Sequence, residues 1–188
     1  MAAIIPVDKP YDKTGVFETF LARIPWLLLL MISATFTGKI IESFESALSK
    51  MTILTAFIPM LMDTGGNCGS QASTMVIRAL ATDEIEPKDV FKVWWKEARI
   101  GIMCGVTLGL VNGIRIFIQY HDLGIAIVIA CTLCLTAVLA KSLGCFLPLL
   151  AKAIHLDPAY MASPLITTIT DACSLAIYFN IALMVLNI

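Results

Sequence analysis

The sequence predicts an all-α membrane protein, and three observations support this fold class. Of the 188 residues, 59% are hydrophobic and only 14% are charged, whereas a soluble domain has about 45–50% apolar and about 25% charged residues. The mean hydropathy is +0.87. The apolar residues form long continuous runs, and a helix that crosses a bilayer needs roughly 20 such residues. Continuous runs, rather than alternating ones, argue against a transmembrane β-barrel.

Five runs are long enough to be transmembrane helices, which predicts five such helices per subunit. The second run is interrupted in its middle by polar residues and glycines, so we expect the second helix to be broken. The runs cover Ile24 to Ile41, Met51 to Ile77, Ile100 to Tyr120, Leu123 to Leu150, and Pro164 to Ile188.

The basic residues predict the orientation of the bundle, because cytoplasmic loops are enriched in Lys and Arg. Most of them fall in the N-terminal segment and between the second and third runs. Lys141 and Lys152 are counted with the connection between the fourth and fifth runs. We therefore expect a cytoplasmic N-terminus and a C-terminus outside.

The domain organisation follows from the runs. Residues 1–21 are predicted to be a short cytoplasmic N-terminal segment, because they lack the charged start and apolar stretch of a signal peptide. Residues 22–188 form one five-helix transmembrane domain. We expect a multi-pass protein of the cell membrane in contact with the lipid bilayer, with no nucleic-acid partner.

The third run carries four glycines at steps of four residues, which places them on one helix face. Such a flat stripe lets another membrane helix approach closely. The stripe consists of Gly101, Gly105, Gly109 and Gly113. It predicts helix packing and no chemistry.

The stretch from Pro59 to Gln71 is unfavourable sequence for a bilayer interior. Proline kinks a helix, and glycines lower its stability. Asp63 and Asn67 need polar partners. Irregular backbone at membrane depth occurs where it is buried in protein or lines water, and such segments supply carbonyls to ions in transporters. Two readings remain open: a broken helix that lines a pore or site, or a loop between two short pieces that dip into the membrane.

The fifth run contains Asp171, about 10 Å from its start at 1.5 Å per residue. A carboxylate within a membrane helix should face a cavity or a partner. Thr167, Asp171, Ser174 and Tyr178 follow helical spacing and share one face. The pattern indicates a cation site. The alternative is an ion pair with a Lys or Arg of another helix. Since the second and fifth helices run in opposite directions, their polar patches can line one cavity.

Several motifs in the same order resemble the MgtE family of magnesium channels. The likeness extends from about residue 20 onward. It rests on Arg23–Leu27, the Gly-Asn-x-Gly-x-Gln pattern of Gly66–Gln71, Val76–Arg78, Asp157–Ala159 and Pro164–Asp171.

The resemblance implies a homodimer with five helices per subunit and an ion path near its two-fold axis, lined by the second and fifth helices. It implies that Asp171 holds a hydrated Mg²⁺, and that backbone carbonyls near Asp63, Gly66 and Thr167 complete the contact with the ion's waters. Mg²⁺ keeps several waters and takes oxygen ligands, and the amide of Asn67 suits that task.

We therefore predict that the protein is a divalent cation channel or transporter, and that the transported ion is Mg²⁺. Residues 22–188 would be the ion-conducting domain. A Na⁺-coupled Mg²⁺ carrier is the alternative. A membrane-embedded enzyme or scaffold is disfavoured, because neither histidine lies near a plausible Ser or Cys nucleophile, so we expect no enzyme activity.

Overall fold

The computed structural model describes residues 14–158 and 163–187, and no strand occurs in these two ranges. Five helices have 24 residues or more, with two short 3₁₀ segments and one short helix between them. The elements are α1 (Val16–Ser43), α2 (Glu45–Lys50), η2 (Thr52–Phe57), α3 (Ile58–Ala81), η3 (Pro87–Asp89), α4 (Val90–Tyr120), α5 (Leu123–Ala153) and α6 (Ser163–Leu186). The all-helical prediction is confirmed for these residues.

Four of the described helical stretches are long and apolar enough to cross a membrane: α1, Pro87–Tyr120, α5 and Leu165–Leu186. The remaining long helix, α3, is less apolar because its middle carries glycines and polar side chains. Four predicted spans are therefore supported by length and composition. The fifth span and the membrane side of each terminus stay predictions, and residues 1–13 and 188 lie outside the described ranges.

The predicted break in the second helix is wrong. Helix α3 continues without interruption from Ile58 to Ala81, through all of its glycines. Pro59 lies in the first turn, where a backbone N–H has no helical partner and proline is tolerated. The interruption of this run lies earlier, where the 3₁₀ segment Thr52–Phe57 precedes α3. The reading of a loop between two short pieces is also wrong for residues 58–81.

Packing explains why α3 stays helical through its glycines. Gly65, Gly66 and Gly69 are all buried and allow α5 and α6 to approach α3 closely. Each glycine costs about 1 kcal/mol relative to alanine in a helix interior. In a membrane, an unsatisfied backbone group costs several kcal/mol, so the intact helix is favoured.

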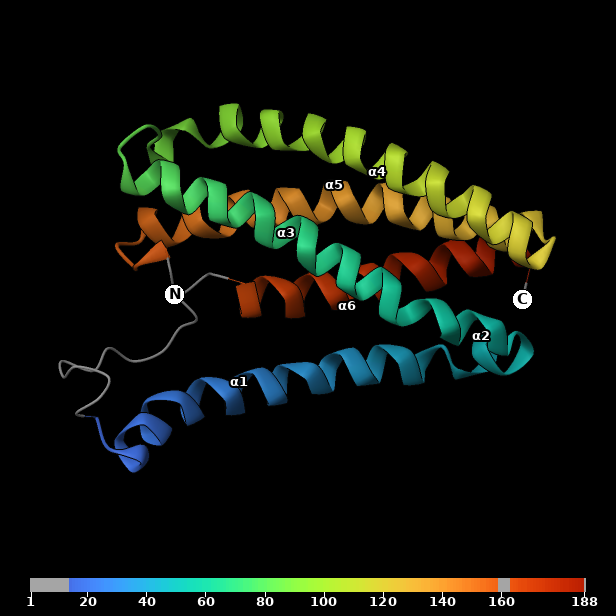
Figure 1. Cartoon of the computed structure of the whole chain (residues 1–188), viewed down its shortest axis with the longest axis horizontal. Coiled ribbons are helices and arrows are strands. Elements are labelled where there is room, and N and C mark those ends of the chain that lie inside the picture. Colours follow the sequence, from blue (N-terminus) through green and yellow to red (C-terminus); the bar gives the residue numbers. More distant parts are fainter. Residues whose placement is uncertain (1–13, 159–162, 188) are drawn as a thin grey trace.

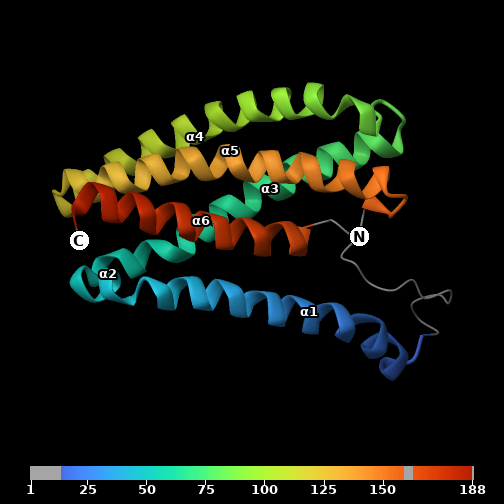
Figure 2. The ribbon, with the colours of Figure 1, turned by 180° about the vertical axis from the view of Figure 1, so that it is seen from behind.

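The long helices form a layer that α3 crosses obliquely. Figures 1 and 2, which view the molecule from opposite sides, show α4, α5 and α6 lying in sequence, with α3 across one face of them. Helix α1 lies at the outer edge beside α6 (Figure 1). Only 6% of the residues in its most apolar part are buried. One edge of the chain is therefore a largely uncovered apolar helix.

The glycine stripe of α4 packs against α5, as predicted. A Cβ placed on Gly101 would lie 2.9 Å from the Val138 Cα. A Cβ on Gly105 would lie 2.7 Å from the Cys134 carbonyl oxygen. The two backbones touch, which only glycine permits at these positions.

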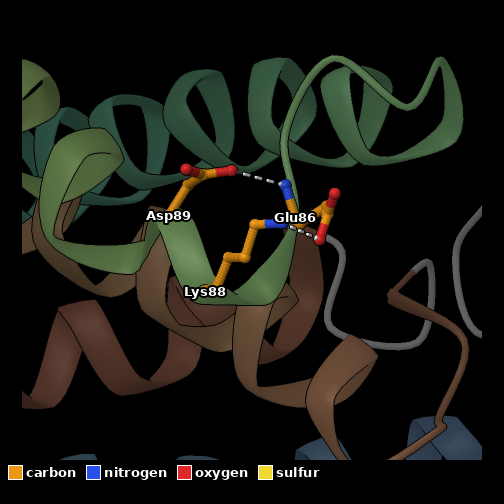
Figure 3. A network of polar contacts seen from close by, with 3 residues as sticks. All are labelled: Glu86, Lys88 and Asp89. Carbon is orange, nitrogen blue, oxygen red and sulfur yellow. Dashed lines mark hydrogen bonds and ion pairs between the residues drawn. The ribbon is translucent and has the colours of Figure 1, made fainter.

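A polar turn begins α4 (Figure 3). The Glu86 backbone N–H donates to Asp89 Oδ2 at 2.9 Å, and the two residues form a capping box. Lys88 Nζ lies 2.8 Å from Glu86 Oε2. These charged side chains lie at the start of the Pro87–Tyr120 stretch, where the chain passes from α3 into α4.

Candidate cation site between helices α3 and α6

Helices α3 and α6 meet at Gly66 and Thr167. A Cβ on Gly66 would lie 2.9 Å from Thr167 Cγ2 and 3.9 Å from Asp171 Oδ1. The absence of a side chain at position 66 therefore brings the backbone of α3 against the acid-bearing face of α6. These three residues lie together, and the expectation that the second and fifth helices line one cavity stays a prediction.

Asp171 is half-buried in this contact. Its Oδ1 is buried and has no hydrogen-bond partner in the described chain. No Lys, Arg or His of residues 14–158 and 163–187 forms an ion pair with it. A charged carboxylate in that position needs a compensating cation. Within one chain, the alternative of a basic partner from another helix has no support.

Asp63 and Asn67 form the outer part of the site, one turn apart on α3. Asn67 Nδ2 donates to Asp63 Oδ2 at 3.1 Å, and both residues are exposed. The carboxylates of Asp63 and Asp171 lie close enough to interact electrostatically. Two acids and an amide oxygen at one edge suit a hard divalent cation that keeps its waters.

Gly66, Thr167 and Asp171 thus lie together, and Asp63 and Asn67 lie beside Gly66 along α3. That these five residues hold one ion stays a prediction. The predicted contact of backbone carbonyls with the ion's waters has less support. Helix α3 is continuous, so its inner carbonyls already accept helical hydrogen bonds. Each carbonyl keeps a second lone pair, so the contacts near Asp63 and Gly66 stay predictions. Within the described residues, no group of three or more His, Cys, Asp or Glu side chains could hold a bare metal ion.

The predicted polar stripe of α6 divides into two parts. Thr167 and Asp171 face the site, whereas Ser174 and Tyr178 are fully buried. Ser174 Oγ donates to the Thr170 carbonyl at 2.6 Å, and Tyr178 Oη donates to the Leu54 carbonyl at 2.9 Å. The second half of the stripe therefore stabilises the fold.

Two buried charged residues depart from what the sequence led us to expect. Lys141 was assigned to a connection, but it lies inside α5 and is 4% exposed. Glu97 of α4, which was not singled out, is 8% exposed. Both could have been noticed in the sequence, because Lys141 is a charged residue inside an apolar run and Glu97 lies just before one.

Comparisons with known proteins identify a family for the chain. A family model described as a divalent cation transporter, MgtE, matches residues 58–181. The chain is 34% identical over 187 residues to "Magnesium transporter MgtE" of Thermus thermophilus, covering 100% of the chain and 41% of the relative. The Bacillus subtilis protein of the same name is 35% identical, with 93% and 39% covered. The one from Enterococcus faecalis is 32% identical, with 86% and 36% covered. The chain thus spans about two fifths of the length of these relatives.

Proposed function

Because the chain belongs to the MgtE family of divalent cation transporters, we propose that it is an integral membrane protein that moves Mg²⁺, with residues 22–188 as the ion-conducting domain. The observation that carries this proposal is Asp171. Its buried Oδ1 has no hydrogen-bond partner in the described residues and lies beside Gly66 and Thr167.

The ion is held as a hydrate. Mg²⁺ loses water reluctantly and binds through few protein oxygens. Asp171 accepts hydrogen bonds from the ion's waters, while Thr167, Asn67 and the carbonyl near Gly66 contact the same shell. Asp63 adds negative charge at the exposed side. An inside-negative potential of 100 mV favours entry of two charges by about 4.6 kcal/mol.

The conducting unit is a homodimer with the path between two copies, lined by α3 and α6. Asp63 and Asn67 are exposed on the single chain, so one chain leaves the site open on that side. A symmetric second copy closes it and doubles the carboxylates, and C₂ dimers are the commonest oligomers.

The test is Mg²⁺ uptake into liposomes that contain the purified protein and a Mg²⁺-sensitive dye. Asp171→Asn retains shape and removes charge, so uptake should fall at least ten-fold while the protein stays folded and dimeric. Glu42→Gln, an exposed acid at the end of α1, is the control and should transport normally. Wild-type uptake by folded Asp171→Asn would overturn the assignment. Uptake that required a Na⁺ gradient would favour the coupled carrier.

A further inference from the structure

A groove runs along α3 and α4. It shares Asn67 with the candidate cation site, but Gly66, Thr167 and Asp171 are not among its lining residues. It consists of three adjoining hollows of about 520, 750 and 480 Å³. Asn67 and Gln71 line both the first and the second. Met75, Lys96 and Glu97 line both the second and the third. The shared lining makes them one continuous groove.

Two charges are buried along the middle of this groove. Lys141 of α5 is 4% exposed and Glu97 of α4 is 8% exposed, and both line the 750 Å³ hollow. In the described ranges, neither forms an ion pair within 4 Å. Charged side chains inside a membrane protein are expensive and mark binding sites or ion paths. A buried ammonium group that shares its hollow with an acid but forms no ion pair with it can bind an anionic ligand.

The charge balance of the groove also favours an anion. The two hollows at the end where α3 finishes and α4 begins are lined by four basic side chains and two acidic ones. The basic ones are Arg78, Lys92, Lys96 and Lys141, and the acidic ones are Glu84 and Glu97. Trp94 lies in the same first turns of α4, and tryptophan prefers the level of the lipid headgroups. Positive charge therefore gathers at headgroup level.

The other end of the groove is more apolar. It is lined on α4 by Met103, Cys104, Thr107 and Leu108. Leu108 lies twelve positions after Lys96 on the helix, which is a distance of about 18 Å along its axis. That length is similar to half of the roughly 30 Å hydrocarbon core. A basic end and an apolar end at this spacing match the headgroup and one acyl chain of a phospholipid.

We propose that the α3–α4 groove binds one anionic phospholipid, with its phosphate between Lys96 and Lys141 and an acyl chain along Met103 and Leu108. Basic pockets between membrane helices are known to take anionic headgroups. Arg78 and Lys92 extend the positive field, and Glu97 offsets the charge of Lys141 when the lipid is absent. This site goes beyond ion transport, since its ligand is a membrane component.

The test is native mass spectrometry of the detergent-purified chain titrated with dioleoyl phosphatidylglycerol or dioleoyl phosphatidylcholine. The wild type should retain one phosphatidylglycerol at concentrations where phosphatidylcholine is lost. Lys96→Gln and Arg78→Gln should each weaken phosphatidylglycerol binding about five-fold, because one basic residue near the headgroups contributes about that factor. Lys152→Gln, exposed in the last turn of α5 and outside the groove, is the matched control and should change binding less than two-fold.

The buried lysine needs a second variant, since Lys141→Gln alone removes the buried positive charge and leaves the buried acid Glu97 in the same hollow. The double change Glu97→Gln and Lys141→Gln removes both charges and should fold while binding phosphatidylglycerol at least five-fold more weakly. Equal retention of both lipids, or no effect of Lys96→Gln, would overturn the proposal. So would full displacement by 10 mM inorganic phosphate, which would indicate a site for free anions, or crosslinks showing a second copy of the chain in the groove. These readouts do not depend on Mg²⁺ transport.

Discussion

Thr167 lies so close to Gly66 that any Cβ at position 66 would be 2.9 Å from the Thr167 methyl carbon. This contact is one of three tight contacts between glycines of α3 and side chains of α6, and it is the one nearest Asp171. The other two join Gly65 to Ser174 and Gly69 to Ile166. The contact of Gly66 with Thr167 is also the one most open to a direct test.

Gly66→Ala should push α6 away from α3. Overpacking of this kind costs about 1–3 kcal/mol, so thermal unfolding in detergent should occur at lower temperature and Mg²⁺ uptake should fall. Gly38→Ala is the control, because nothing lies within 4 Å of a Cβ there. Adding Thr167→Ser removes the methyl group and should restore most of the lost stability. If the double variant is no more stable than Gly66→Ala, this contact does not limit the approach of the helices.

Asp63→Asn should weaken Mg²⁺ binding without abolishing uptake. Asp63 is exposed and hydrogen-bonded to Asn67, so its charge is more screened than that of Asp171. We expect the half-saturating Mg²⁺ concentration to rise about five-fold, as for the loss of about 1 kcal/mol of electrostatic attraction. Uptake measured over a range of Mg²⁺ concentrations checks this. An effect as large as that of Asp171→Asn would make the two acids equal partners.

Gly105→Ala should destabilise the packing of α4 on α5. The added Cβ would lie 2.7 Å from the carbonyl oxygen and 2.8 Å from the Cα of Cys134, and backbone cannot move aside as a side chain can. We expect a loss of about 1–3 kcal/mol, measured by chemical or thermal unfolding. Gly113→Ala, where the nearest atom is the Ala130 Cβ at 3.3 Å, should cost clearly less. The reverse order would contradict the observed helix contact.

Tyr178→Phe should loosen the junction between α6 and the 3₁₀ segment before α3. The variant leaves the Leu54 carbonyl, which is in a fully buried residue, without the phenol that donates to it at 2.9 Å. That carbonyl keeps its backbone donor within the 3₁₀ segment Thr52–Phe57, so the loss of one hydrogen bond costs about 0.5–1.5 kcal/mol. Unfolding experiments should show this loss while Mg²⁺ uptake per folded molecule stays unchanged. Wild-type stability would mean that another donor replaces the phenol.

Much of the helical layout could be predicted because it depends on local sequence. Apolar runs of bilayer length must form helices in lipid, since no water is present to satisfy the backbone. The four-residue spacing of Gly101 and Gly105 likewise predicts a packing face from helix geometry alone. Asp171 stands out as the acid in an apolar run, which is a property of composition.

Other features depended on neighbours that are distant in the sequence. Pro59 and Gly65 predict an interrupted helix when only local propensity is considered, yet α3 is continuous. The close contacts of α5 and α6, together with the cost of unsatisfied backbone in a membrane, outweigh the weak propensity of glycine.

The sequence by itself determined that this protein is helical, that it lies in a membrane and that Asp171 is the acid to examine, because run length and side-chain polarity are local quantities. Only the tertiary structure decided that α3 is unbroken, that Gly66 brings Thr167 and Asp171 to the same place, and that Lys141 is buried beside the α3–α4 groove. Those outcomes depend on how closely two helices approach, and that distance follows from the side chains on both of them.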